Sequence, residues 1–323
     1  MIEVSAPSNI ALIKYMGKVD SSSNTPTNSS LSYALENFRT TVTVEKNTSP
    51  IDEWRPLIGN QFHRIELSSK GKEKFLSHFN LMKKALGLDG FYKISSANNF
   101  PSDAGLASSA SSFAALTRAA YALKKSMDVS FEISDEGLST LSRQGSGSSC
   151  RSFFSPWAIW DEESAREIKL PIQKLNHHVF IFESGVKKVS SSEAHSRVVQ
   201  SPLFKTDSNG RSRVERAEKR MSELLASFQE HHWTKSYEIC WEEFWDMHEL
   251  FHTSTPAFTY LTEEVKQTLK KMQSRWKKEG CGPIITLDAG ANIHALFRHE
   301  DKDLLQSWQA EFEPRIQLGS KVH

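Results

Sequence analysis

Three segments that lie far apart in the chain carry residue types suited to holding phosphate or moving a proton: residues 98–110, 145–151 and 287–292. In the first, a loop of small residues leads into an Ala-rich stretch, residues 109–125, that is expected to be helical. Unpaired backbone N–H groups and the helix dipole favour an anion at such a helix start. Gly105 would let the backbone approach a ligand closely, and Ser108 and Ser109 would add hydroxyl donors. Taken alone, the segment is equally typical of a Gly/Ser cap on a buried helix.

The second and third segments add a positive and a negative side chain. Gly and Ser fill residues 145–149 just before Arg151, and a guanidinium beside such a turn suits bidentate binding of phosphate or carboxylate oxygens. The alternative is a solvated loop with a surface arginine. Asp288 follows an apolar run expected to be a buried strand, where an enzyme could place a base, although a turn-forming Asp is common there. The chain has no G-x-x-x-x-G-K-[ST] motif, so any phosphate site would differ from a P-loop.

Together with residues 6–18 and 26–30 near the N-terminus, these segments resemble one family closely. The chain is similar to the mevalonate diphosphate decarboxylases, which belong to the GHMP superfamily of small-molecule kinases. The resemblance continues in order through residues 101–110, 145–151, 188–191 and 288–290, so it spans about nine-tenths of the chain. The small-residue loop would indicate only the superfamily. Lys14, Arg151 and Asp288 occurring together indicate the decarboxylase branch.

The resemblance implies an ATP-dependent decarboxylation of mevalonate 5-diphosphate to isopentenyl diphosphate, with ADP, phosphate and carbon dioxide as the other products. Asp288 would orient or deprotonate the tertiary hydroxyl, Lys14 would stabilise negative charge, and Arg151 would complete the catalytic set. ATP with Mg²⁺ would be held by Ser96, Asn98, Gly105, Leu106, Ala107, Ser108 and Ser109. The substrate's diphosphate and carboxylate would be held by Tyr15, Lys18, Ser146, Gly147, Ser148, Arg151 and Ser191. No residue is assigned as a protein ligand to a metal.

Several positions depart from the family pattern. Met16 stands where Trp is usual, and Asp103 lies in the phosphate loop, where it could repel phosphate or help hold Mg²⁺. Residues 154–157 and Thr253 also differ, and Glu193-Ala194-His195 replaces a continuation with Gly-Met. These departures leave two alternatives open. The protein could be a kinase or decarboxylase relative that acts on mevalonate or its monophosphate, or a catalytically silent nucleotide-binding protein.

A zinc hydrolase is a more remote alternative. Residues 248–252 satisfy H-E-x-x-H, a motif that places two His one helical turn apart. The apolar stripe of this helix is defined by Cys240, Phe244, Met247 and Phe251, so we expect His248 and His252 to lie at its edge instead. No further His ligand motif follows, which also argues against zinc. The pairs His177-His178 and His231-His232 are interpreted as ordinary surface or strand-end residues.

The fold class implied by the resemblance is α+β: a two-lobed GHMP-kinase-like fold with an N-terminal ribosomal-S5-domain-2-like half and a C-terminal ferredoxin-like half. We expect domains at residues 1–183 and 184–323, with the active site between them. Apolar periodicity predicts strands at 2–4, 40–45, 91–95, 179–182, 283–287 and 293–297. The same reasoning predicts helices at 72–86, 109–125, 134–143, 213–229, 235–252, 263–278 and 302–312, and loops at 21–30 and 205–213.

Composition narrows the class of protein. The 323 residues contain 40 Lys and Arg against 39 Asp and Glu, so no basic field favours nucleic acid or an anionic membrane. The three cysteines are widely spaced and form no C-x-x-C, which favours a reduced, cytoplasmic setting. Neither a signal peptide nor a membrane-spanning stretch is evident. The family resemblance implies a homodimer.

Overall fold

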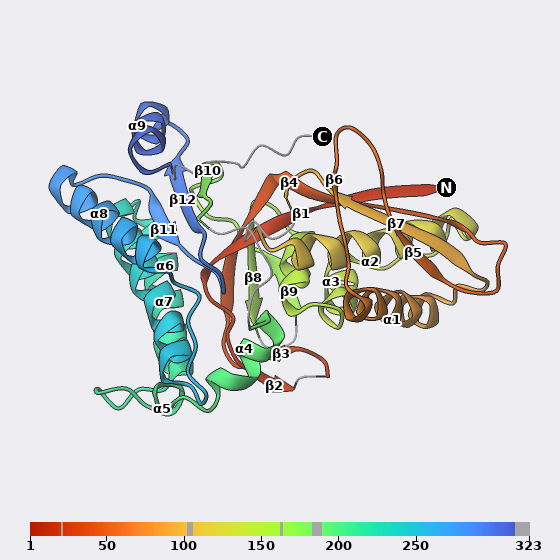
Figure 1. The fold of residues 1–323 in the computed structure, drawn as a ribbon, viewed down its shortest axis with the longest axis horizontal. Helices are drawn as coiled ribbons and strands as arrows, with labels where there is room; N and C mark the ends of the chain where they lie inside the picture. The colour runs from red at the N-terminus through yellow and green to blue at the C-terminus, as the bar shows by residue number, and fades with distance from the viewer. Residues whose placement is uncertain (21, 102–105, 162–163, 183–188, 314–323) are drawn as a thin grey trace.

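The computed structural model describes residues 1–20, 22–101, 106–161, 164–182 and 189–313. Its central feature is a long antiparallel pair of strands, β1 (Ile2–Ile13) and β4 (Ser30–Lys46), which runs between two groups of helices (Figure 1). The β-branched run Thr40–Val44 favours the extended backbone of β4. Strand β1 ends immediately before Lys14, so this pair of strands carries that side chain into the middle of the molecule.

Strand β4 also anchors the rest of a seven-stranded sheet with the order β5-β7-β4-β8-β9, in which β1 pairs with β4 and β6 with β7. The remaining strands of this sheet are β5 (Glu53–Pro56), β6 (His63–Arg64), β7 (Tyr92–Asn98), β8 (Trp157–Asp161) and β9 (Ser164–Glu167). Its helices are α1 (Ser69–Leu86), α2 (Ser108–Met127), α3 (Asp135–Arg143) and the 3₁₀ helix η1 (Gly147–Phe153). Most of the residues expected to bind ligand lie at the ends of these elements.

The second group of elements is built on a three-stranded antiparallel sheet with the order β10-β12-β11. It consists of β10 (Leu175–Phe180), β11 (Ile284–Thr286) and β12 (Ile293–Arg298), with helices α4 (Ser191–Val198), α5 (Pro202–Lys205), α6 (Arg213–Gln229), α7 (Trp233–Thr253), α8 (Glu263–Glu279) and α9 (Lys302–Phe312). The division expected at residue 183 stays a prediction, and β10, which precedes it, pairs with β12.

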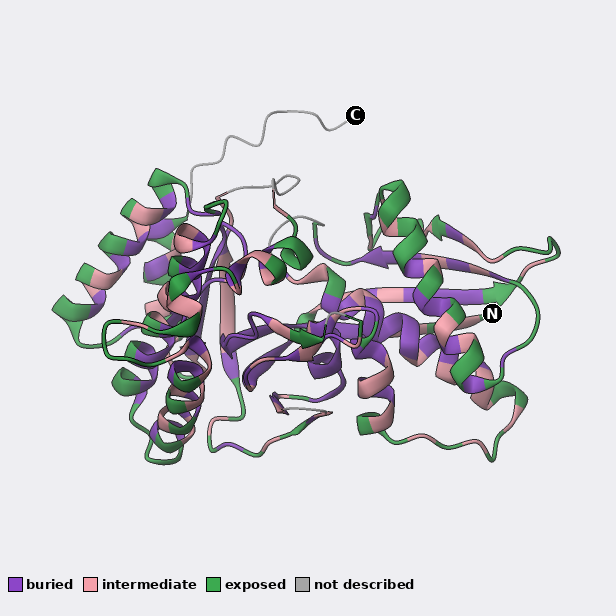
Figure 2. Ribbon diagram, turned by 90° about the horizontal axis from the view of Figure 1, so that it is seen from below, coloured by how far each residue is buried: buried purple, intermediate pink, exposed green. Residues whose placement is uncertain are grey.

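Buried residues line the central strands and the inward sides of the helices, whereas exposed residues lie on the outer surfaces (Figure 2). One hydrophobic core extends from β1 into the sheet of β10, β11 and β12, since Ile10, Phe180 and Ile293 belong to the same buried cluster. The two groups of elements are therefore packed against each other, which fixes the ends of β1 and β11 relative to one another. Within the described ranges, none of the helices combines the length and the apolar character needed to cross a membrane.

Most predicted elements are confirmed. Strands β1, β4 and β7 are longer than predicted, whereas β11 is shorter and β10 begins and ends earlier in the chain. Helices α6 and α9 have the predicted limits, and α6 begins with a capping box in which Ser212 and Glu215 exchange hydrogen bonds. The prediction of a loop over residues 21–30 is wrong in part. The short strands β2 (Lys18–Asp20) and β3 (Thr25–Pro26) pair as a hairpin there. The Asp20 carboxylate stabilises the turn between them by accepting a hydrogen bond from Ser22 N–H.

Candidate active site

A cavity of about 450 Å³ lies where the end of β1, the start of α2, helix η1, the start of α4 and the segment after β11 meet. Most of the predicted site residues line it: Lys14, Tyr15, Lys18, Leu106, Ala107, Ser108, Ser109, Ser146, Gly147, Ser148, Arg151, Ser191 and Asp288. The three segments that the sequence singled out thus converge on one space. Gly105 and Asp103 lie outside the described residues.

Lys14 and Asp288 form an ion pair at one wall of this cavity. The Lys14 Nζ atom lies 2.7 Å from Asp288 Oδ1, and the two side chains are 2% and 31% exposed. Burial lowers the pKa of Lys14, opposed by the charge of Asp288. Burial alone would raise the pKa of Asp288, but the charges of Lys14, His294 and Arg151 outweigh it and hold that pKa below its usual range. Asp288 is therefore an ionised carboxylate that remains accessible from the cavity.

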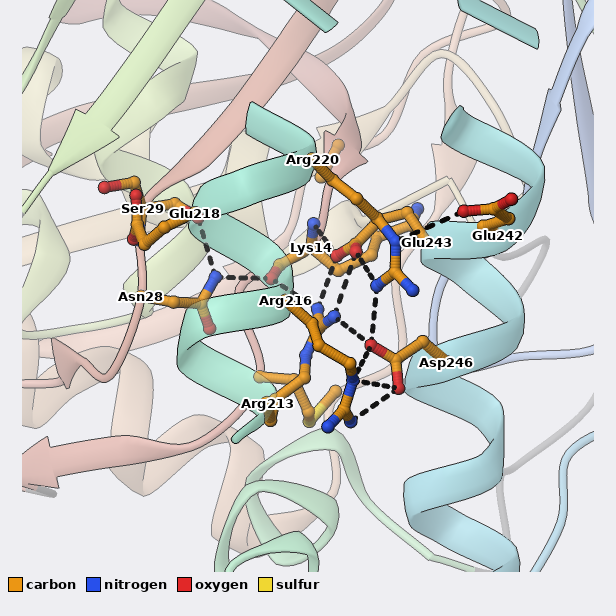
Figure 3. A network of polar contacts seen from close by, with 12 residues as sticks. Lys14, Asn28, Ser29, Arg213, Arg216, Glu218, Arg220, Glu242, Glu243 and Asp246 are labelled. Atoms are coloured by element: carbon orange, nitrogen blue, oxygen red, sulfur yellow. Dashed lines mark hydrogen bonds and ion pairs between the residues drawn. The ribbon is translucent and has the colours of Figure 1, made fainter. Parts of the chain in front are cut away.

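The backbone of Lys14 is held by a buried network of charges from α6 and α7 (Figure 3). Glu243 Oε1 accepts a hydrogen bond from Lys14 N–H at 2.9 Å, and Arg213 donates to the Lys14 carbonyl oxygen at 3.2 Å. Arg213 and Glu243 are fully buried and paired with each other. Asn28 Nδ2 also donates to the Lys14 carbonyl, at 3.0 Å. Both polar groups of the Lys14 backbone are thus hydrogen-bonded, which fixes the point from which the buried side chain extends toward Asp288.

The sequence prediction missed this network. Glu243 and Asp246 on α7 face Arg213, Arg216 and Arg220 on α6, with Arg220 Nη1 lying 2.6 Å from Asp246 Oδ2. The available signal was the placement of charged residues among the apolar positions of two predicted helices. A charge pattern of that kind is more often a solvated helix face, so it does not by itself indicate a buried network.

Arg151 lies on η1, and its guanidinium is buried beside the cavity. Its Nη1 donates to Ser30 Oγ at 2.7 Å, and its Nε, also buried, has no hydrogen-bond partner among the described residues. The guanidinium carbon lies 5.7 Å from the centre of the Trp160 ring. The predicted Gly/Ser turn is thus a 3₁₀ helix that carries an inward-facing cation, and the alternative of a surface arginine is wrong.

Only glycine fits at position 147, because the Tyr15 ring lies against it. A Cβ atom added at Gly147 would lie 2.8 Å from Tyr15 Cε1, a distance that real side chains do not reach. The Tyr15 ring is itself packed against Trp160, with ring centroids 4.6 Å apart, so it cannot move aside easily. The glycine therefore allows η1 to approach the cavity wall, and its backbone lies where a ligand could contact it.

The start of α2 supports the interpretation as an anion site over a simple helix cap. Its N-cap residue, Ala107, has a φ of 47° and supplies no side-chain hydrogen bond to the helix. Ser108 and Ser109 line the cavity, so the first backbone N–H groups of the helix are at its edge. Such groups favour a phosphate, and an uncapped helix start facing a cavity is suited to hold one.

Ser96 and Asn98, predicted to contact nucleotide, are buried side chains of β7 that do not belong to the cavity lining. Ser96 Oγ accepts a hydrogen bond from Trp54 Nε1 at 2.8 Å, and Asn98 Oδ1 accepts one from Thr40 Oγ1 at 2.7 Å. Both contacts stabilise the sheet behind α2. A role of these two residues in nucleotide binding stays a prediction.

The cavity contains further residues that the sequence did not indicate. Lys74 of α1 lines it together with Lys14, Lys18 and Arg151. Among the described lining residues, four cationic side chains and the single carboxylate of Asp288 make the lining suited to a highly charged anion. Burial lowers the pKa of Lys74, and the nearby charge of Lys70 lowers it further. Nothing in the sequence distinguishes Lys74 from the other lysines of its helix. His195 of α4 was noted only as a departure from the family pattern, yet it also lines the cavity.

The H-E-x-x-H residues do not form a metal site. His248 is fully buried, contrary to the expectation that it lies at the edge of the apolar stripe, and its Nε2 lies 3.2 Å from the Asp288 carbonyl oxygen. Burial lowers the pKa of His248 to about 3. His252 Nε2 lies 3.0 Å from Thr259 Oγ1 instead. Across the part of the chain that the structure describes, no three His, Cys, Asp or Glu side chains are grouped to hold a metal ion.

The prediction for His177 is also wrong, whereas that for His231-His232 is confirmed. His177 lies within β10, and its Nε2 is 2.9 Å from His294 Nδ1. Pairing between β10 and β12 places these two rings together, so His177 is a sheet residue, not a strand end. His231 and His232 are exposed between α6 and α7.

Comparison with known proteins agrees with this geometry. Residues 6–169 match the family described as the diphosphomevalonate decarboxylase-like N-terminal domain. A diphosphomevalonate decarboxylase from Debaryomyces hansenii is 30% identical, over 92% of this chain and 79% of that protein. A crystal structure of a mevalonate diphosphate decarboxylase from Legionella pneumophila is 41% identical, with a TM-score of 0.88 and 98% of both chains covered.

A third similar protein, named MDDEF, has been solved in complex with MVAPP, AMPPCP and magnesium. It is 28% identical, with a TM-score of 0.81 over 97% of this chain and 93% of that one. The α+β fold, the family model and the identity over nearly the whole length agree. The chain belongs to the diphosphomevalonate decarboxylase family.

Proposed function

We propose that this protein catalyses the ATP-dependent decarboxylation of mevalonate 5-diphosphate to isopentenyl diphosphate. The observation that carries the proposal is the Lys14–Asp288 ion pair, which presents an ionised carboxylate to a cavity whose lining also includes Lys18, Lys74 and Arg151. A carboxylate of this kind can accept a proton from a hydroxyl, while the cations hold the phosphates and the carboxylate of the substrate. The family membership supports the same reaction.

The reaction needs a good leaving group on a tertiary carbon. The substrate's C3 hydroxyl oxygen attacks the γ-phosphorus of ATP, the bond from that phosphorus to ADP breaks, and Asp288 orients the hydroxyl or takes its proton. The C3–O bond then breaks, so the new phosphate leaves with the electron pair and positive charge develops at C3. The bond between C2 and the carboxylate carbon supplies electrons for the C2=C3 double bond, which releases carbon dioxide. Lys14 keeps Asp288 ionised before the hydroxyl proton is transferred.

ATP and Mg²⁺ fit the residues at the start of α2. Leu106, Ala107, Ser108 and Ser109 would hold the phosphates of ATP through backbone N–H groups and hydroxyls, together with Gly105, and Ser96 and Asn98 are proposed to support the nucleotide from behind. When bound, Mg²⁺ neutralises negative charge on the transferred phosphate. Complexes of a relative with AMPPCP, an ATP analogue, and magnesium support this assignment.

Substrate binding is proposed for the other end of the cavity. Tyr15, Lys18, Ser146, Gly147, Ser148, Arg151 and Ser191 would hold the diphosphate and the carboxylate. The buried Arg151 Nε suits a planar oxyanion, because a buried donor without a partner is costly unless a ligand satisfies it. We also propose that the protein is a homodimer with domains at residues 1–183 and 184–323. A cytoplasmic location is proposed as well, and it accords with three free cysteines.

The direct test is to incubate the protein with Mg-ATP and, separately, mevalonate, mevalonate 5-phosphate and mevalonate 5-diphosphate, measuring ADP and carbon dioxide in each. We expect equal amounts of both products with the diphosphate only. ADP without carbon dioxide would identify a kinase that stops at the 3-phosphate. Turnover of the monophosphate would identify a relative with another substrate, and no product with any form would identify a silent protein.

A further inference from the structure

His195 is held in a fixed position and tautomer by the backbone of Gly17. The Gly17 N–H donates to His195 Nδ1 at 3.0 Å, so Nδ1 is the acceptor and the neutral ring carries its proton on Nε2. Gly17 has a φ of +97°, and an added Cβ would lie 2.8 Å from Phe204 Cε2, so the position requires glycine. The orientation of the imidazole is therefore set before any ligand binds.

The His195 side chain also belongs to the wall of the cavity. Its ring packs on Tyr15 with centroids 4.3 Å apart. Among the described residues, Nδ1 has its partner in Gly17, whereas none is a hydrogen-bond partner for Nε2. Burial, followed by the charges of Lys18 and Arg151, lowers the pKa of His195 to about 3. At neutral pH the group is thus an uncharged donor beside two cations.

Its neighbours indicate which part of a ligand it would contact. The charges that act on His195 are those of Lys18 and Arg151. The Tyr15 ring packs on the imidazole and also lies beside Gly147 on η1. The proposed function places the reacting hydroxyl at Asp288, and the charge of Arg151 acts on both Asp288 and His195. Lys18 acts on His195 and is left for the charged phosphate end of the substrate, so we place that end beside His195. A neutral donor there adds a directional hydrogen bond without adding a fifth positive charge to the cavity.

We propose that His195 donates a hydrogen bond from Nε2 to the 5-diphosphate of the substrate and so contributes to its selection. This inference rests on the proposed function, because it takes mevalonate 5-diphosphate as the ligand. It assigns a role to a residue of Glu193-Ala194-His195, the segment that replaces the continuation with Gly-Met implied by the family resemblance, and neither Gly nor Met has a side-chain hydrogen to donate. The phosphate end is therefore contacted here by one donor that the family pattern lacks.

Two substitutions separate this role from simple anchoring of Gly17. Asn places an acceptor near the position of Nδ1 but no donor near Nε2, whereas Gln places an N–H near Nε2 and nothing at Nδ1. The binding of mevalonate 5-diphosphate to wild type, His195→Asn and His195→Gln is measured by calorimetry, with AMPPCP binding and melting temperature on the same preparations. We expect the Kd for the diphosphate to rise about tenfold to a hundredfold in His195→Asn and less than about threefold in His195→Gln.

AMPPCP affinity should stay within about twofold of wild type in both variants, since the start of α2 is unchanged. Stronger diphosphate binding by His195→Asn than by His195→Gln, or equal binding by the two, would overturn the inference and leave His195 as an anchor for Gly17. A wild-type protein that binds no mevalonate 5-diphosphate would overturn the proposed function as well, which distinguishes the two failures.

Discussion

Lys14 and Asp288 are separated by 274 positions in the sequence, yet Lys14 Nζ and Asp288 Oδ1 lie 2.7 Å apart. Lys14 follows the last residue of β1, and Asp288 follows β11 by two residues. The Thr286 hydroxyl donates to the Ala11 carbonyl at 3.4 Å, which ties the two strands together just before the ion pair. The packing of the two groups of elements thus creates the reactive pair, and neither group contains it alone.

Arg151 is the cation whose removal should most clearly weaken substrate capture. Arg151→Ala removes a buried guanidinium whose charge-assisted hydrogen bonds are worth about 1.5–3 kcal/mol each. We therefore expect kcat/KM to fall by about tenfold or more. Arg118→Ala is the matched control, because Arg118 bonds to Phe153 O and Asp135 outside the cavity. Steady-state kinetics with the diphosphate substrate provide the measurement, and equal kcat/KM values in the two variants would place Arg151 outside the site.

Two adjacent glutamates on α7 test the network that holds Lys14. Glu243→Gln removes a buried charge that faces Arg213 and Arg220, which should lower the free energy of unfolding by about 3–5 kcal/mol. Glu242→Gln removes an exposed charge 3.8 Å from Arg220 and should cost less than about 1 kcal/mol. Denaturant unfolding of both variants gives the comparison. Similar stability losses would contradict the importance of the buried network.

The sequence predicted elements well where the signal is local and poorly where it depends on packing. The limits of α6 follow from its apolar period and from the cap at Ser212, both of which are visible in the sequence. The burial of His248 and Glu243 depends on α7 packing against β11 and α6, which periodicity does not specify. Lys74 reaches the cavity through the position of α1 in the fold, so only the structure identifies it.

The same distinction applies to the site. Arg151 and Asp288 were identifiable because each lies in a segment with an unusual residue pattern, whereas Lys14 was identified through the family resemblance of residues 6–18. The role of Gly147 depends on the Tyr15 ring beside it, and that contact joins residues far apart in the chain. Residue type and family pattern therefore predicted which residues line the site, whereas the shape of the cavity could be seen only in the folded structure.

Buried histidines should make the protein less stable in mild acid. Burial lowers the pKa values of His78 and His248 to about 3, so both stay neutral in the folded state at pH 5–6.5. In the unfolded chain they bind protons below about pH 6.5, so the unfolded state gains protons and stability falls as pH drops from 6.5 toward 3. Each buried histidine contributes up to about 1.4 kcal/mol per pH unit in that window.

His78→Gln tests this dependence, since His78 is buried away from the cavity lining and contacts Thr117 Oγ1 at 3.0 Å. The slope of unfolding free energy against pH is measured between pH 5 and 6.5. It should decrease by the amount that corresponds to about one bound proton, up to about 1.4 kcal/mol per pH unit. His63→Gln, at an exposed position, is the matched control variant. An unchanged slope in His78→Gln would show that its imidazole titrates alike in both states.

Zinc should play no part in the activity. His248 faces the Asp288 carbonyl and His252 faces Thr259, so the two rings have different partners. His252→Ala should therefore retain turnover within about twofold, and metal analysis of protein purified without added zinc should find much less than one equivalent. One equivalent of zinc, lost together with a peptidase activity in His252→Ala, would contradict this prediction.

Asp288→Asn tests the central claim most directly, because it removes the charge and the proton acceptor while keeping nearly the same volume. The measurement is carbon dioxide release from mevalonate 5-diphosphate with Mg-ATP, with melting temperature and AMPPCP affinity determined on the same preparation. If Asp288 orients or deprotonates the tertiary hydroxyl, carbon dioxide release should fall by about 10²–10⁴-fold while AMPPCP affinity stays close to wild type. A folded variant that releases carbon dioxide at nearly the wild-type rate would contradict the catalytic role of the Lys14–Asp288 pair.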